Sequence, residues 1–267
     1  MHQVVAVFLE EGHVIFPPRP PKRGWLAQSK DTFDHWRKPR YDPQPLRRAI
    51  GRLIDEGATL GDALHPLAIP AVNVTQGQPQ VFKTRHKREW NRDWKCRAAD
   101  VAVATAAAPT FFQTAEVGGS LFADGGLFAN APDLLVMHEA EHFFGVRPEH
   151  QRVVSVGTTT RSYSLSFSSG RDMGIGDWIE DQRLFNVMIS AQQQFVDQLV
   201  RHRLGGHYCR IDHEPSQEQA KDLGLDVATD AAKQTLMALA GKAASDRLAG
   251  DLAPFLAHTP QLTIFKD

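Results

Sequence analysis

The most specific part of the sequence reads AADVAVATAAAPTFF (residues 98–112), FADGG (122–126) and NAP (130–132). Small apolar residues dominate the first stretch, and this composition predicts a tightly packed, buried helix that ends at Pro109. The three stretches together predict a helix, a strand, a sharp turn and a second helix in close succession.

The turn is the part of this region that can carry chemistry. A short strand is predicted over residues 120–123, so Asp124 stands at a strand end, where α/β folds place reactive groups. Gly125 and Gly126 permit a tight turn, positive φ if required, and the close approach of another backbone or a substrate. Pro132 is predicted to occupy the first position of the helix that follows.

Outward from this centre, strands and helices alternate. Apolar spacing and turn residues predict a hairpin from residues 67–74 and 80–84, with Pro70 favouring an early position or a bulge in its first strand. The run RVVSVG at 152–157 predicts a central strand. Further helices are predicted over residues 1–11 with Gly12 as C-cap, 46–54, 60–64, 177–203 and 226–257, a last strand over 208–211, and a proline-rich loop over 16–42. This alternation indicates an α/β layered fold.

The order of these motifs resembles the catalytic domain of patatin-like phospholipases. Members of that family carry a small-residue helix ending in Ala-Ala-Pro-x-x-Phe, then a strand ending in Asp-Gly-Gly or Asp-Gly-Ala, then Asn-x-Pro. The resemblance extends to DALHPLAIPA at 62–71 and VVSVGT at 153–158, and is best over residues 1 to about 160.

The resemblance implies a three-layer α/β/α fold around a central sheet. Residues 1–135 would form the C-terminal part of the catalytic domain, and residues 136–267 the rest of the same fold with its C-terminal helices. It also implies that Asp124 takes the proton of a serine that attacks a lipid acyl ester, without an intervening histidine, and that Gly125 and Gly126 form the motif turn.

A plainer interpretation needs no catalysis. Asp124 would cap the turn that follows it, and Asn130 would cap the helix that opens at Pro132. The surrounding matches favour the catalytic interpretation.

The nucleophile of the family is missing from this sequence. Its Gly-x-Ser-x-Gly elbow occurs nowhere in the 267 residues, nor does the glycine-rich oxyanion segment. One such oxyanion donor contributes roughly 2.7–4 kcal/mol to lowering a barrier. We therefore expect an N-terminally truncated domain that lacks its first strand or strands and is inert alone. The alternative is a degenerate patatin-like protein that binds lipid or a partner without hydrolysis.

A distant rival is a zinc metallopeptidase, because His138, Glu139 and His142 form a literal H-E-x-x-H. The charged Glu141 between them and the lack of a third ligand at a suitable interval count against it. Asp172, Asp177 and Glu180 are third-ligand candidates without a motif.

Composition sets the remaining expectations. Thirty Lys and Arg residues balance 31 Asp and Glu residues, which removes the electrostatic reason to expect nucleic-acid binding. Cys96 and Cys209 form no disulfide framework and fit a reducing cytoplasm. No apolar run approaches the ~20 residues of a membrane span, and no signal peptide is recognised. The resemblance implies no metal or organic cofactor and a lipid or phospholipid partner, and is compatible with membrane-surface contact and self-association.

Overall fold

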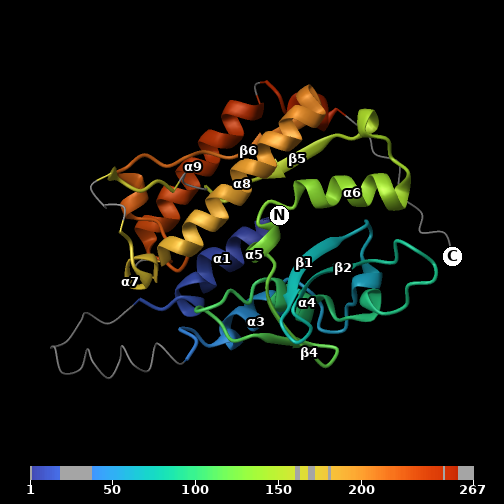
Figure 1. Ribbon diagram of the computed structural model, residues 1–267, viewed down its shortest axis with the longest axis horizontal. Helices are drawn as coiled ribbons and strands as arrows, with labels where there is room; N and C mark the ends of the chain where they lie inside the picture. The colour runs from blue at the N-terminus through green and yellow to red at the C-terminus, as the bar shows by residue number, and fades with distance from the viewer. Residues whose placement is uncertain are drawn as a thin grey trace. The chain divides into compact units, whose positions relative to one another are not determined.

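The computed structural model describes residues 2–18, 38–159, 163–167, 172–179, 182–248 and 250–257 (Figure 1). Most of the predicted 16–42 loop therefore lies outside the described residues. The chain divides into two compact units. Met1–Gly126 with Gly224–Lys233 belongs to the first, and Leu127–Leu223 with Gln234–Gln261 to the second. The predicted division at residue 135 stays a prediction.

The first unit is built on a four-stranded antiparallel sheet. Its strand order is β2 (Gln78–Lys83), β1 (Ala68–Asn73), β4 (Ser120–Asp124) and β3 (Ala115–Val117). The predicted hairpin of β1 and β2 is confirmed. The sheet and its helices confirm the mixed α/β class with a central sheet.

Pro70 lies inside a central strand, a position where proline is normally excluded because it lacks an N–H donor. The structure accommodates it because β1 pairs with β4 only over Ala71, Val72 and Asn73. Pro70 therefore stands just before the second ladder begins, opposite Val81 of β2. The expectation of an early position is correct for the pairing with β4.

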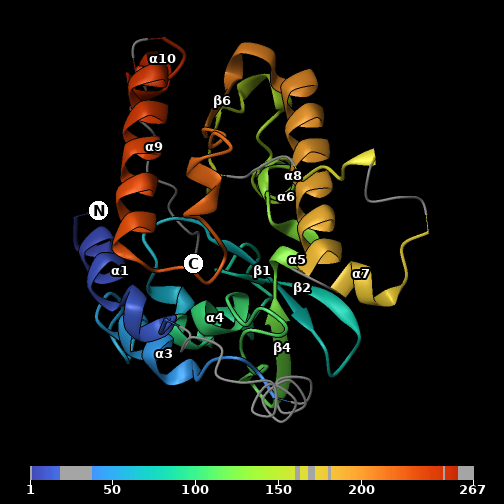
Figure 2. The same cartoon turned by 90° about the vertical axis from the view of Figure 1, so that its left-hand side faces the viewer.

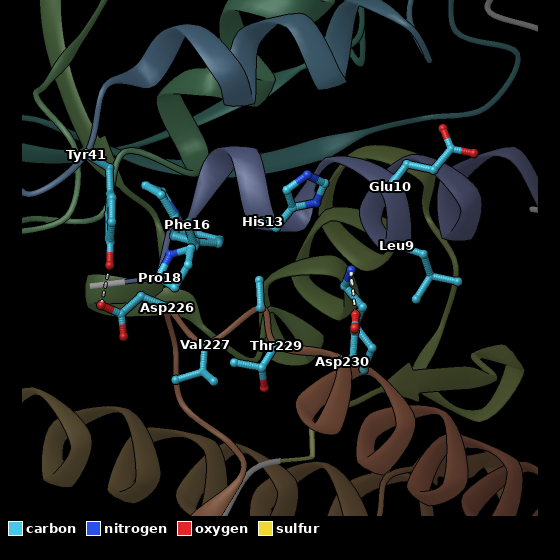
Figure 3. Close-up of a pocket in the computed structure, with 13 residues that line it drawn as sticks. Leu9, Glu10, His13, Phe16, Pro18, Tyr41, Asp226, Val227, Thr229 and Asp230 are labelled. Carbon is cyan, nitrogen blue, oxygen red and sulfur yellow. Dashed lines mark hydrogen bonds and ion pairs between the residues drawn. The ribbon is translucent and has the colours of Figure 1, made fainter. Parts of the chain in front are cut away.

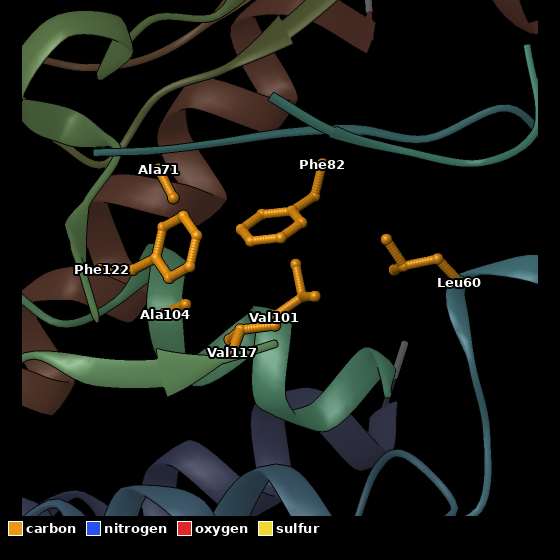
Figure 4. Close-up of a cluster of buried hydrophobic side chains, with 7 residues drawn as sticks. All are labelled: Leu60, Ala71, Phe82, Val101, Ala104, Val117 and Phe122. Carbon is orange, nitrogen blue, oxygen red and sulfur yellow. The ribbon is translucent and has the colours of Figure 1, made fainter. Parts of the chain in front are cut away.

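Helix α4 (Ala98–Thr105) covers this sheet, and its small residues let it pack closely. The core between them is a cluster of buried side chains in which the rings of Phe82 and Phe122 lie 4.9 Å apart (Figure 4). The predicted buried small-residue helix is thereby confirmed, but its predicted end at Pro109 is wrong, because α4 ends at Thr105. The cluster consists of Leu60, Ala71, Phe82, Val101, Ala104, Val117 and Phe122.

A second cluster holds the N-terminal helices. Helices α1 (His2–Ile15) and α3 (Pro43–Gly51) contact each other and bury Val7, Ile15 and Leu46 with the aromatic residues of 111–112. The prediction that the first helix stops at Gly12 is wrong. The helix continues for one more turn because Ile15 is almost fully buried in this cluster.

The second unit contains a two-stranded parallel sheet of β5 (Val153–Val156) and β6 (Tyr208–Ile211). The expectation that 152–157 is a central strand is wrong, because β5 pairs only with β6 among the described residues. Figure 1 shows β5, β6, α8 and α9 together in this unit, and Figure 2 shows β6, α8 and α9 from another side. Its helices are α6 (Asp133–Phe144), α7 (Ile175–Ile179), α8 (Arg183–Leu204), α9 (Asp230–Leu248, whose first turn belongs to the first unit) and α10 (Ala253–Leu256).

The long helix predicted over 177–203 is interrupted. Gln182 has a positive φ of 57°, and α8 begins after it. Short helical segments complete the described chain: η1 (Leu60–Asp62), η2 (Asp93–Lys95), α5 (Gly126–Ala129), η3 (Pro148–His150), η6 (Gly205–His207) and η7 (Gln219–Lys221). None of the helices in the described part of the chain combines the length and apolar character needed to cross a bilayer.

Candidate active site

Asp124 is the last residue of β4, as the sequence predicts, and pairs across the sheet with Ala71. Its amide donates a hydrogen bond to the carbonyl of Ala107, 2.9 Å away, just after α4. The sheet and the end of α4 therefore fix the backbone that carries the carboxylate.

Gly125 is required by a close backbone approach rather than by a positive φ. A Cβ atom at this position would lie 2.1 Å from the Pro70 carbonyl oxygen, which no side chain tolerates. Its amide donates to the Thr105 carbonyl at 3.3 Å. The glycine thus lets the chain turn against β1 directly after the aspartate.

Gly126 begins α5, and its amide donates to Asp124 Oδ1 at 2.6 Å. The carboxylate therefore caps the turn, as the plainer interpretation expects. This bond engages Oδ1, and a general base needs one carboxylate oxygen directed at the hydroxyl proton. Capping and general-base chemistry are compatible in this geometry.

Burial shifts the titration of the same carboxyl group. Desolvation raises the pKa of Asp124 above its ordinary value of 3.8, and the hydrogen bond from the Gly126 amide opposes this shift. A base with a raised pKa holds an abstracted proton more firmly. This is the direction in which proteins tune carboxylates for proton transfer near neutral pH.

Thr105 supports the same corner, and sequence reasoning missed it. Its hydroxyl donates to the Pro70 carbonyl oxygen at 2.6 Å, next to the point where Gly125 crosses. The available signal was a lone hydroxyl residue within an alanine run. Thr105 is a positioning residue, since it acts on the backbone that carries Asp124.

We expect Thr105→Val to lower the free energy of unfolding by about 1–2 kcal/mol, because the Pro70 carbonyl loses a partly buried donor. Thr75→Val is the matched control, since Thr75 accepts from the Leu121 amide at an exposed site that water can serve. Its expected loss is under about 0.5 kcal/mol. Urea unfolding of both variants measures the difference, and equal losses would contradict this role for Thr105.

The predicted cap at Asn130 is wrong. Helix α6 starts one residue later than expected, with Pro132 at its N-cap and no side-chain hydrogen bond there. The backbone amide of Asn130 instead donates to Gln192 Oε1 at 2.7 Å. Asn130 therefore belongs to the packing between this segment and α8.

The H-E-x-x-H residues lie on α6, one turn apart. The rings of His138 and His142 stack with centroids 5.3 Å apart, and Glu139 is buried. Glu141 forms an ion pair with Arg203 at 3.3 Å.

The proposed third zinc ligands fall differently in the structure. Asp177 lies in α7, Asp172 precedes that helix, and Glu180 is outside the described residues. Within the described ranges, no group of three or more His, Cys, Asp or Glu side chains is placed to hold a metal ion.

Comparisons with known proteins agree with the motif order. The family described as Patatin-like phospholipase matches residues 15–135, which contain β1 to β4, α4 and Asp124. The chain is 35% identical over 268 residues to a cGAMP-activated phospholipase of Pseudomonas aeruginosa, covering 99% of this chain and 77% of that protein.

Two further relatives carry the same name. The relative from Vibrio cholerae is 33% identical over 84% of this chain and 66% of its own length. The relative from Escherichia coli is 33% identical over 88% of this chain and 68% of its own length. Patatin-like protein 2 of Arabidopsis thaliana is 27% identical over 82% of the chain. With the Asp-Gly-Gly turn in its expected place, the chain belongs to the patatin-like phospholipase family.

Proposed function

We propose that this chain supplies the general base of a lipid acyl hydrolase, with Asp124 as the base of a Ser–Asp dyad. The observation that carries the proposal is a half-buried carboxylate at a strand end, with its backbone bonded to α4 and its pKa raised by burial. The substrate class, a phospholipid or related lipid ester, follows from the family.

The reaction would proceed in two halves. A serine hydroxyl attacks the ester carbonyl carbon while Asp124 takes its proton, and that proton then passes to the departing alcohol. Water, deprotonated by the same carboxylate, releases the fatty acid from the acyl-serine and restores the free hydroxyl. Fixed donors near the developing oxyanion would supply much of the barrier lowering.

The 267 residues contain no serine in the family's Gly-x-Ser-x-Gly motif. We propose that the chain as printed does not turn over lipid, and that activity requires a polypeptide segment bearing Gly-x-Ser-x-Gly. The rival from another class is a degenerate, non-catalytic lipid- or partner-binding protein.

Nucleotide control is a second proposal, supported by three relatives whose names describe cGAMP-activated phospholipases. We extend that control to this chain as a cyclic-dinucleotide effector that switches lipid hydrolysis. A cytoplasmic location, contact with a membrane surface and self-association would suit such an enzyme and are proposed with it.

The test uses two forms of the protein and a chromogenic acyl ester. We expect no turnover above background from the chain as printed. We expect turnover, with cGAMP present, when the chain is extended by a patatin-family segment carrying Gly-x-Ser-x-Gly. An extension with Gly-x-Ala-x-Gly is the matched control. Turnover by the printed chain would contradict the proposal, and so would a folded serine-bearing form that stays inactive both with and without cGAMP.

A further inference from the structure

The first unit contains an open pocket that the proposed chemistry does not use (Figure 3). Its volume is about 940 Å³, and all 13 lining residues belong to this unit. Side chains of α1 form one side, and residues 226–230 with the first turn of α9 form the other. Ligand pockets span roughly 300–1,000 Å³, so this one suits a ligand at the large end of the range.

The walls combine two kinds of surface. Leu9, Phe16 and Val227 provide apolar and aromatic area, against which a flat ring can pack. His13, Asp230 and Lys233 provide polar groups of both signs.

The pocket's carboxylates are paired with cations. Glu10 forms an ion pair with Arg52 at 3.1 Å, and Asp226 forms one with Arg40 at 2.7 Å. The carboxylate of Asp230 lies 3.6 Å from the ammonium group of Lys233. Pairing offsets the negative charge that would otherwise repel an anionic ligand. Carboxylates accept hydrogen bonds from base amines, while Lys233 and His13 suit a phosphate oxygen.

A path of hydrogen bonds, joined by the backbone of residues 107–111, runs from this pocket to Asp124 within the same unit. Tyr41 lines the pocket, and its hydroxyl donates to Asp226 at 2.7 Å. The Tyr41 amide donates to the Phe111 carbonyl at 2.8 Å, and their rings stack 6.3 Å apart. Four residues before Phe111, the carbonyl of Ala107 accepts the Asp124 amide.

The 105–112 segment therefore makes backbone bonds on both sides. Near the pocket, the carbonyls of Thr110 and Phe111 accept hydrogen bonds from the amides of residues 40–41. At the other end, the carbonyls of Ala107 and Thr105 accept hydrogen bonds from the amides of Asp124 and Gly125.

Thr110, toward the C-terminal end of this segment, has a φ of 72°. Such a conformation strains a β-branched residue and is held only by surrounding contacts. A segment under strain and held from two sides is suited to move when one side changes.

We propose that this pocket is an effector site for a cyclic dinucleotide, and that binding there acts on Asp124 through the 105–112 segment. The inference rests on the proposed nucleotide control and adds its location and its route to the base. The bases of the nucleotide would pack against the apolar wall, and the carboxylates would accept hydrogen bonds from the base amines. Lys233 and His13 would bind the phosphates.

Direct binding to the printed chain tests the site without needing catalysis. Titration calorimetry with cGAMP is expected to show saturable binding, with a mixture of AMP and GMP binding at least tenfold more weakly. Lys233→Ala and His13→Ala are each expected to weaken cGAMP binding at least tenfold. Lys242→Ala is the matched control, because Lys242 lies on the same helix, pairs with Asp246 and does not line the pocket.

Amide hydrogen exchange tests the route. Saturating cGAMP should change the protection of the Asp124 and Gly125 amides, and leave that of Val74, which bonds the Leu121 carbonyl within the same sheet region, unchanged. Unchanged Asp124 and Gly125 amides would overturn the coupling.

The remaining outcomes separate the proposals. Binding of cGAMP that neither Lys233→Ala nor His13→Ala weakens would overturn the pocket assignment and leave nucleotide control standing. No saturable binding would overturn both, while the Asp124 dyad would still be judged by the ester assay. Equal binding of the AMP and GMP mixture would overturn the cyclic-dinucleotide assignment.

Discussion

In a serine-bearing form of the protein, Asp124→Asn is expected to reduce ester hydrolysis by roughly 10²–10⁴-fold, the usual contribution of a positioned general base. Asparagine keeps the size of the side chain and an oxygen able to accept the Gly126 amide, so the turn should survive. What it cannot do is take the serine proton. The loss should appear in kcat/KM at every pH at which the unmodified enzyme works.

The pH dependence gives this prediction a second measurement. Because burial raises the pKa of Asp124, the active, ionised base should be lost as pH falls through that raised value. The acid limb of the kcat/KM profile should therefore lie above the ordinary 3.8. Retained activity in Asp124→Asn, or an acid limb at the ordinary value, would count against Asp124 as the base.

Stability is the control for the same substitution. A folded-state pKa above the unfolded value means that the folded form holds the proton more tightly. Stability is then fully present below the ordinary pKa and declines as pH rises through the folded pKa. Asp124→Asn should thus be at least as stable as the unmodified chain at pH 7, and the difference should vanish near pH 3. A large loss of stability at pH 7 would mean that structure, not chemistry, explains an inactive variant.

Gly125→Ala is expected to have the largest effect on stability. The new Cβ would lie 2.1 Å from the Pro70 carbonyl oxygen, and both groups are backbone elements tied into the sheet and the end of α4. Neither can rotate away, so β1 and β4 must shift relative to each other. We expect a loss of more than about 3 kcal/mol, above the usual range for overpacking, or failure to fold.

The matched control for this change is Gly51→Ala. Gly51 ends α3, and a Cβ atom added there would meet no other atom within 4 Å, so alanine should be neutral or slightly stabilising. Urea unfolding monitored by circular dichroism compares the two variants. If Gly125→Ala unfolds at the same urea concentration as Gly51→Ala, the close-approach explanation is wrong.

Local signals predicted the parts of the fold that depend on neighbouring residues. The hairpin of β1 and β2, the buried α4 and the strand-end position of Asp124 follow from turn chemistry and side-chain size. These features are encoded within a few residues of where they appear. The sequence therefore sufficed for the candidate base and its turn.

Long-range packing decided the parts that sequence reasoning missed. Ile15 extends α1 past Gly12 because it is buried against residues far along the chain, and no local pattern reports that burial. The β1–β4 pairing joins residues about 50 positions apart, and the β5–β6 pairing depends on a crossover. The pocket combines α1 with residues 226–233, so it is visible only once the chain has folded.

The contrast between Asp124 and Gly125 bears on how this chain would change under relaxed selection. Gly125 is held by the backbone of β1, so an inactive descendant that still folds must keep it. Asp124 is disfavoured by its own burial, so the same descendant gains nothing by keeping a carboxylate where an amide would serve the turn. An intact Gly125 is therefore poor evidence that a distant relative of this protein is catalytically active, whereas an intact Asp124 is informative.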